Sequence, residues 1–157
     1  MSEPSSRLPP LPWRGGCQCG QVRYEITEHP MTLYCCHCTE CQAQSASAFG
    51  MSLRVASSAV KLHGATSKYI RDHGRKTEVE CLFCSYCGTR ILHRRDSLAA
   101  NYSIKAGSLD EPLTPVGHIW VKSKPDWLEL PDGDPQYETQ PDDQYAALIE
   151  AFATKYG

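Results

Sequence analysis

Seven of the nine cysteines in this chain fall into three short groups whose spacings suit metal ligands. The groups are Cys17-Gln18-Cys19, Cys36-His37-Cys38-Thr39-Glu40-Cys41 and Cys84-Ser85-Tyr86-Cys87. A structural zinc site is closed by four protein ligands, whereas a catalytic zinc has three and keeps one position open. Because seven is four plus three, the cysteines predict two zinc ions per chain, one structural and one catalytic.

The first and third groups together predict the closed site. In an extended backbone residues i and i+2 point to the same side, so Cys17 and Cys19 can reach one ion. Cys84 and Cys87 suit a tight turn around a metal, and a glycine at the next position, Gly88, relieves the strain of such a turn. We expect these four cysteines to hold a structural zinc that pins an N-terminal strand pair to a late hairpin.

The second group predicts the open site. Cys36, Cys38 and Cys41 supply three thiolates within six residues and leave one vertex of a tetrahedron free. Three thiolates on a divalent ion give a centre of net charge −1, which is a weaker Lewis acid towards water than a histidine site. Such a soft centre favours sulfur, so the spacing indicates a catalytic zinc that binds a thiol substrate.

One alternative uses fewer cysteines. A single zinc ribbon could form from the two C-x-x-C pairs, Cys38/Cys41 and Cys84/Cys87. However, 42 residues separate the pairs, against about 15–20 in common two-knuckle modules. The ribbon would also leave the other three clustered cysteines without a role.

Other reactive side chains are weaker candidates. His37 could supply a proton or a fourth ligand, although strand alternation points it away from the flanking cysteines. Glu40 could act as a base, but its position is more typical of a solvated turn. The remaining cysteines and strand histidines are expected to be structural: Cys35, Cys81, His93 and His118. The arginines that could hold substrate carboxylates are Arg54, Arg90, Arg94 and Arg95.

Length and composition predict one soluble domain. A chain of 157 residues is long enough for a single core, and 22% charged residues with 9% aromatic residues are unlike a disordered protein. Residues 1–13 contain four prolines and no apolar run, so we expect neither a signal peptide nor a membrane span. We therefore expect a cytoplasmic protein, in which thiols persist as metal ligands and not as disulfides.

The net charge of −2 is unevenly distributed. Residues 1–60 have four basic and four acidic side chains, residues 61–124 have eleven and six, and residues 125–157 have one and eight. The basic middle could attract an anionic small molecule, although a solvated surface balanced by the acidic C-terminal part explains it as well. No finger pattern and no basic recognition helix are present, so we expect no nucleic-acid partner.

Short alternating segments predict a mainly β fold. The expected strands are 21–26, Met31–Cys35, Phe49–Val55, Ser67–Arg71, Thr77–Phe83, Thr89–His93, Leu98–Ile104 and His118–Lys122, with turns such as His73-Gly74 and Asp110-Glu111-Pro112. Residues 125–141 contain four prolines and are expected to be irregular. One helix is expected to begin at Asp142 or Asp143 and to pack an apolar face made by Tyr145, Leu148, Ile149, Phe152 and Tyr156.

Five motifs in order give the chain a resemblance to a known family. The motifs that carry it are Gly15-Gly16-Cys17-Gln18-Cys19-Gly20-Gln21-Val22-Arg23-Tyr24, Cys36-His37-Cys38-Thr39-Glu40-Cys41, Phe83-Cys84-Ser85-Tyr86-Cys87-Gly88-Thr89, Gly107-Ser108-Leu109-Asp110-Glu111-Pro112 and His118-Ile119-Trp120-Val121-Lys122-Ser123-Lys124-Pro125-Asp126-Trp127. They resemble the motifs of the glutathione-dependent formaldehyde-activating enzyme and centromere protein V family.

The resemblance implies a fold, a metal assignment and an activity. The fold would be mainly β, with tent-like antiparallel sheets (Mss4-like) pinned by zinc over residues 15–137, between a Pro-rich segment 1–14 and a C-terminal helical extension 138–157. Cys17, Cys19, Cys84 and Cys87 would hold the structural zinc, and Cys36, Cys38 and Cys41 the catalytic one. The activity would be that of a carbon–sulfur lyase, which makes or breaks the adduct between glutathione and formaldehyde. A zinc-stabilised module that binds a thiol or a protein without turnover is the alternative.

The chain departs from the family after the third cysteine of the second motif. Many relatives have arginine-lysine there, whereas this chain has Gln42-Ala43. Two cations that could hold the carboxylates of an anionic thiol are therefore missing next to the open zinc. From the sequence we expect glutathione to bind weakly and a differently charged thiol to be preferred.

Overall fold

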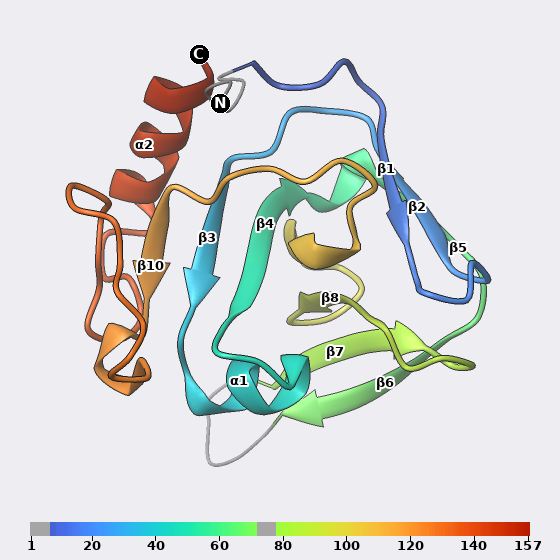
Figure 1. The fold of residues 1–157 in the computed structure, drawn as a ribbon. Coiled ribbons are helices and arrows are strands. Elements are labelled where there is room, and N and C mark those ends of the chain that lie inside the picture. Colours follow the sequence, from blue (N-terminus) through green and yellow to red (C-terminus); the bar gives the residue numbers. More distant parts are fainter. Residues whose placement is uncertain (1–6, 72–77) are drawn as a thin grey trace, which may run out of the picture.

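The computed structural model describes residues 7–71 and 78–157 and has two β-sheets and two α-helices (Figure 1). The strands are β1 (Trp13–Gly16), β2 (Arg23–Ile26), β3 (Thr32–Cys36), β4 (Gly50–Ala56), β5 (Val60–His63), β6 (Thr66–Arg71), β7 (Val79–Cys84), β8 (Arg90–Arg94), β9 (Asn101–Lys105) and β10 (Gly117–Ile119). The helices are α1 (Thr39–Ser45) and α2 (Ala146–Tyr156), with 3-10 turns η1 (Ser57–Ala59), η2 (Ala106–Ser108) and η3 (Val121–Ser123).

The two sheets are almost entirely antiparallel. The smaller sheet has the order β1-β2-β5, and the larger has the order β10-β3-β4-β9-β8-β7-β6. Among the strand pairs of the described residues, β10 with β3 is the parallel one, with His118 opposite Cys35. The prediction of a mainly β fold with a short C-terminal helix is confirmed.

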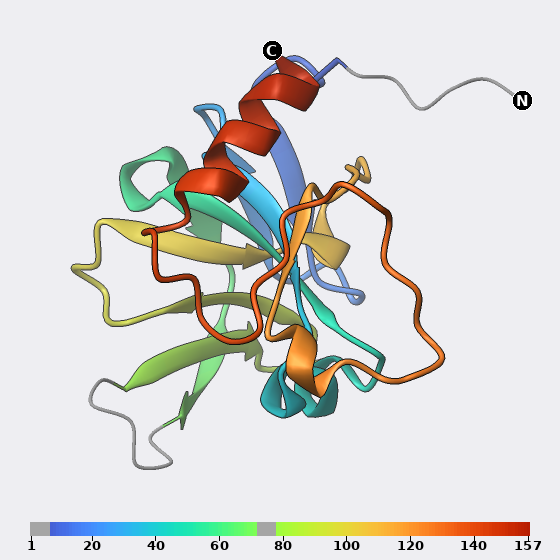
Figure 2. The same ribbon diagram turned by 90° about the vertical axis from the view of Figure 1, so that its left-hand side faces the viewer.

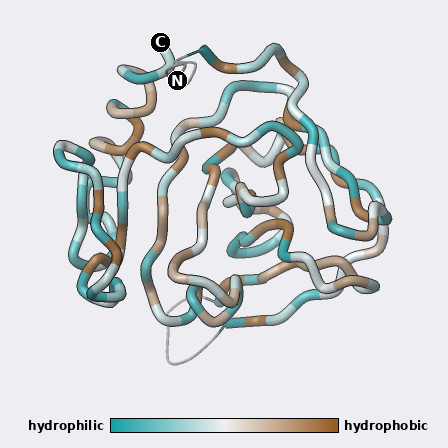
Figure 3. The backbone as a smooth tube through the Cα atoms, viewed as in Figure 1, coloured by the Kyte–Doolittle hydropathy of each residue, from teal (hydrophilic) through white to brown (hydrophobic). Residues whose placement is uncertain are grey.

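Buried apolar side chains from both sheets form the main core. Tyr24 and Ile26 of the small sheet pack with Leu33, Leu53 and Ile104 of the large one. Hydrophobic residues are spread along the strands and not gathered in one stretch (Figure 3). In β2 the alternating pattern reflects burial of one face, whereas every residue of β3 is buried. Burial of apolar surface is the main stabilising contribution in such a fold.

The C-terminal helix covers the side of the large sheet near β3 and β10 (Figure 2). Leu148 and Phe152 are buried, as the predicted apolar face requires, but Ile149 is 36% exposed. The helix begins at Ala146, three residues after Asp143, whose carboxylate accepts a hydrogen bond from the Ala147 amide at 3.1 Å. Asp143 thus satisfies one free amide of the first turn, but the N-cap residue is Tyr145, with a left-handed φ of 67°, and not Asp142 or Asp143 as predicted.

Several elements differ from the sequence prediction. Two strands, β1 and β5, and the helix α1 were not predicted, because each is short and α1 begins inside a cysteine motif. The predicted strand His118–Lys122 ends at Ile119, since Trp120 takes a left-handed φ of 58° and the chain turns into η3. Thr77 and the turn His73-Gly74 lie outside the described residues.

The segment 125–141 has no helix and no strand, as predicted, and runs along the surface before α2 (Figure 2). The predicted limits of the zinc-binding domain at residues 15 and 137 stay a prediction, although Trp13 is already buried. Within the described part of the chain, the helices are too short or too polar to cross a membrane.

Candidate metal centres

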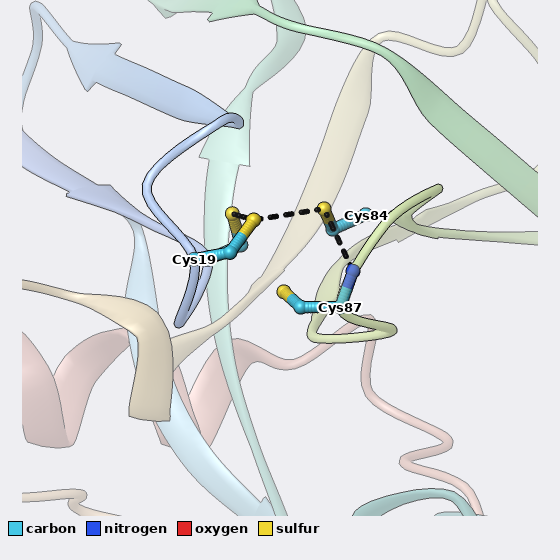
Figure 4. Close-up of side chains that lie close together, drawn as sticks. Cys19, Cys84 and Cys87 are labelled. Atoms are coloured by element: carbon cyan, nitrogen blue, oxygen red, sulfur yellow. Dashed lines mark hydrogen bonds between the residues drawn. The ribbon is translucent and has the colours of Figure 1, made fainter.

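The first cysteine cluster joins two loops that are distant in the sequence. Cys17 and Cys19 come from the loop between β1 and β2, whereas Cys84 ends β7 and Cys87 lies in the turn that follows it. Figure 4 shows Cys19 from the first loop facing Cys84 and Cys87. The four sulfurs lie within 4.8 Å of one another. The Cys17–Cys19 and Cys19–Cys84 sulfur distances are 3.4 and 3.7 Å.

These distances fit a metal ion of the zinc type. A tetrahedral zinc with bonds of about 2.3 Å to sulfur places its ligands about 3.8 Å apart. Backbone amides also point at the sulfurs: the Val22 amide donates to Cys17 at 3.2 Å, and the Tyr86 and Cys87 amides each donate to Cys84 at 3.4 Å. Burial acts to raise the pKa of the Cys17 thiol, but the hydrogen bond from the Val22 amide helps to lower it below the usual value, which favours the thiolate that binds a cation.

The backbone of both loops is shaped by glycine. Gly20 and Gly88 have φ values of +84° and +81°, a region that residues with a side chain rarely adopt. The Gly88 amide closes the second turn by donating to the Cys84 carbonyl at 3.0 Å. Thr89 then links the loops, because its hydroxyl accepts from the Gln18 amide at 3.1 Å. Hydrogen bonds from Thr89 also lower the pKa of the Cys87 thiol to about 5.

The second cluster lies where β3 passes into α1. Cys36 ends β3, Cys38 is the N-cap of α1 and Cys41 is in its first turn. The Cys38 sulfur accepts a hydrogen bond from the Cys41 amide at 3.3 Å. This N-cap hydrogen bond therefore also holds Cys38 close to Cys41. The three sulfurs lie within 4.8 Å of one another. In residues 7–71 and 78–157, no further histidine, cysteine or carboxylate belongs to this group.

Two cations from distant strands surround Cys41. Arg71, at the end of β6, points both terminal nitrogens at the Cys41 sulfur at 3.8 and 3.9 Å. Lys105, at the end of β9, is 9% exposed. The pKa of the Cys41 thiol is lowered, first by hydrogen bonds from the Cys36 and Cys38 thiols and then by the positive charges of Lys105 and Arg71.

His37 lies between two of these cysteines but points elsewhere. It is fully buried, and its Nε2 is 3.2 Å from Nδ1 of His118. The other ring nitrogen of His118 is 3.2 Å from the Asp134 carboxylate. This series of contacts, from His37 through His118 to Asp134, ties the cysteine loop to β10 and to the segment that follows β10. The structure therefore directs the His37 ring to His118 and not to the three sulfurs.

Gln42 does not face the metal cluster. Its side-chain amide donates to the His37 carbonyl at 2.8 Å and to the Ser123 carbonyl at 2.9 Å. It therefore holds the start of α1 against η3. Although cations are absent at positions 42 and 43, Arg71 and Lys105 bring positive charge to the same place from β6 and β9. Sequence reasoning missed both residues, because nothing in their local spacing relates them to Cys41.

A groove of about 620 Å³ lies beside both clusters. Residues that line it include Cys41 and Lys105 from the surroundings of the second cluster, and Cys17 and Thr89 from those of the first. Of the four arginines predicted to hold a substrate, Arg90 lines this groove. The others lie apart: Arg54 is over the Tyr145 ring, Arg94 is paired with Glu80, and Arg95 is exposed.

The remaining sequence predictions can now be placed. Cys35 and Cys81 are buried outside both clusters, and burial raises the pKa of Cys35 to about 12, as for a core thiol. His93 is buried, and its burial followed by the charges of Lys105 and Arg71 holds its pKa well below the usual value. The single zinc ribbon is wrong, because its two C-x-x-C pairs belong to different clusters.

A mainly β domain with two thiolate clusters beside one groove defines a protein that could hold two zinc ions. The family model described as glutathione-dependent formaldehyde-activating enzyme matches residues 12–123. This match covers more than two thirds of the 157 residues, so the chain belongs to that family. The resemblance carried by the cysteine motifs is thereby confirmed.

More distant comparisons add little. The crystal structure of a Rhodobacter sphaeroides protein, a structural-genomics target, is 22% identical and covers 62% of this chain and 87% of its own, with a TM-score of 0.49. That likeness is too remote to support an argument about function. No curated protein matches the chain significantly.

Proposed function

We propose that the protein is a carbon–sulfur lyase that forms or cleaves the adduct between a thiol, glutathione or a similar molecule, and a small aldehyde such as formaldehyde. The observation that carries the proposal is the cluster of Cys36, Cys38 and Cys41, which offers three sulfurs and borders a groove through Cys41. Three ligands are the number typical of a catalytic zinc, and the family match supports this reaction type.

The two clusters and the cations beside Cys41 would have different roles in the reaction. A zinc ion held by the three sulfurs would bind the substrate thiol as its thiolate, the nucleophilic form. Arg71 and Lys105 hold positive charge beside Cys41 and so stabilise the negative charge that collects on sulfur. The first cluster, with four ligands, would be structural and would hold the groove wall formed by Cys17 and Thr89.

The reaction balances without an oxidant or reductant. In the forward direction the sulfur lone pair forms a bond to the aldehyde carbon, and the carbonyl π pair becomes a lone pair on oxygen. The proton lost by the thiol ends on that oxygen, which gives an S-hydroxymethyl thioether from formaldehyde. Cleavage is the reverse. The protein has only to hold the sulfur as thiolate and to keep the aldehyde within reach of it.

Two-dimensional exchange NMR tests the proposal, because it measures interconversion of glutathione and its formaldehyde adduct at equilibrium. We expect the exchange rate to rise in proportion to the concentration of zinc-loaded protein, above the rate with the same concentration of zinc sulfate. An unchanged rate, together with measurable binding of glutathione, would instead identify a thiol-binding module without turnover.

A further inference from the structure

A buried arginine contacts the helix that carries Cys41 at three places. Arg71 ends β6 and is 6% exposed. Its Nη2 donates to the Gln44 side-chain oxygen at 3.0 Å, and its Nη1 is 3.5 Å from the Glu40 carboxylate. The same two nitrogens point at the Cys41 sulfur, Nη2 at 3.8 Å and Nη1 at 3.9 Å. One guanidinium therefore joins the end of β6 to three residues of α1.

These contacts fix the direction of the guanidinium. Glu40 and Gln44 are four residues apart, so they lie one above the other on the same side of α1. A guanidinium is planar and its N–H groups have a fixed geometry. Two partners on the helix therefore determine that the terminal nitrogens face the Cys41 sulfur. Because α1 has only seven residues and a helix of this length is not stable alone, the position of Cys41 depends on tertiary contacts of this kind.

The two cations beside Cys41 act in different ways. Glu40 balances the charge of Arg71. Lys105 is buried and acts on Cys41 through its charge, and it lines the groove together with Cys41. The positive charge that offsets the thiolates is therefore left to Lys105. Arg71 contributes directed hydrogen bonds, which hold one side of the Cys41 sulfur and leave the other side for a metal ion.

We propose that Arg71 is the positioning residue of the three-cysteine site: it holds the Cys41 sulfur beside Cys36 and Cys38 and thereby sets how tightly this site binds its metal ion. The inference rests on the function proposed above, which assigns zinc to this cluster. Replacing a group that hydrogen-bonds to a metal ligand typically weakens metal binding by about tenfold to a hundredfold. A site with three protein ligands depends on such a group more than a closed site does, because its ion has to stay bound while thiols come and go.

Competition with a chromophoric zinc chelator tests the proposal, because it measures the affinity of each ion independently of activity. We expect the wild-type protein to hold two ions and to lose the one at the three-cysteine site first. Arg71→Gln should lower the affinity for this ion about tenfold to a hundredfold and leave the four-cysteine site unchanged. Arg71→Lys should give an intermediate affinity, since lysine keeps the charge but not the pair of directed N–H groups.

Arg94→Gln is the matched control. Arg94 also ends a strand, β8, and among the described residues its side chain donates to the Glu80 carboxylate at 2.9 Å and to the Tyr102 hydroxyl at 3.3 Å, and to no clustered cysteine. Removing this guanidinium should leave the affinities for both ions as they are in the wild-type protein.

Two further measurements separate positioning from a general effect on the fold. Gln44→Ala removes a partner of Arg71 and should loosen the second ion in the wild-type protein but have little effect in Arg71→Gln, because Gln44 acts through Arg71. When cobalt(II) replaces zinc, its sulfur-to-metal charge-transfer absorption should shift in Arg71→Gln and not in Arg94→Gln.

Three results would overturn the proposal. They are an unchanged affinity for the second ion in Arg71→Gln, an equal weakening of both ions, and a wild-type protein that binds a single ion at the four-cysteine site. The proposed function can fail separately. If Arg71→Gln loosens the second ion as expected, but the wild-type protein does not speed the exchange between glutathione and its formaldehyde adduct, the positioning role stands and the lyase activity is wrong.

Discussion

Replacing Cys84 by serine is expected to abolish cooperative folding. The cluster of four cysteines joins the loop after β1 to the turn after β7, and Cys19 and Cys84 are 65 residues apart. Zinc binding to a structural site contributes about 10–16 kcal/mol in small zinc domains, as much as the whole stability of a typical domain, about 5–15 kcal/mol. Circular dichroism during heating should show no sigmoidal transition, or a Tm lowered by tens of degrees.

Cys81→Ala is the matched control for this variant. Cys81 is buried three residues earlier on the same strand but belongs to neither cluster. Removing its sulfur leaves only a small cavity, and we expect a loss of about 1–2 kcal/mol with the transition intact. Similar melting curves for the two variants would show that the four-cysteine cluster does not hold the fold together.

Replacing Cys38 by serine is expected to leave a folded protein without activity. Cys38 caps α1 through its sulfur, and serine is a favourable N-cap residue, so the helix keeps its cap. The open site, however, loses one of its three thiolates. Elemental analysis should find one zinc ion in place of two, and exchange NMR should give the rate seen without protein.

Cys35→Ala tests whether the loss is specific to the cluster. Cys35 is the preceding residue on β3, is 2% exposed and lies outside the cluster. The Cys35→Ala variant should retain two zinc ions and the exchange rate of the wild-type protein. If Cys38→Ser lowers the Tm as much as Cys84→Ser does, the two clusters do not have separate roles.

Local patterns were sufficient to predict the short cysteine groups that form the two clusters. The spacing within each cysteine group is short, so the thiols that could share an ion are close whatever the rest of the chain does. Alternation likewise predicted strands such as β2, in which buried Tyr24 and Ile26 alternate with half-buried Arg23 and Glu25. The division into four and three cysteines needed one long-range assumption, and the structure brings the sulfurs together in that division.

The electrostatic surroundings could not be predicted in the same way. Arg71 and Lys105 reach Cys41 only because β6 and β9 belong to the same seven-stranded sheet as β3. No repeat and no short spacing in the sequence relates Arg71 or Lys105 to Cys41. The sequence therefore indicated a loss of positive charge at Gln42 and Ala43, whereas the folded chain restores it from other strands. The same limit applies to α1, which is only seven residues long and depends on its cysteine cap.

X-ray absorption at the zinc edge tests the central claim most directly. Seven cysteine sulfurs shared by two ions give an average zinc–sulfur coordination number of about 3.5. Adding glutathione should raise it to about 4, because the thiol sulfur becomes the eighth ligand. A number that stays at about 3.5 with glutathione and with every other thiol tested would contradict a thiol-binding zinc centre in this protein.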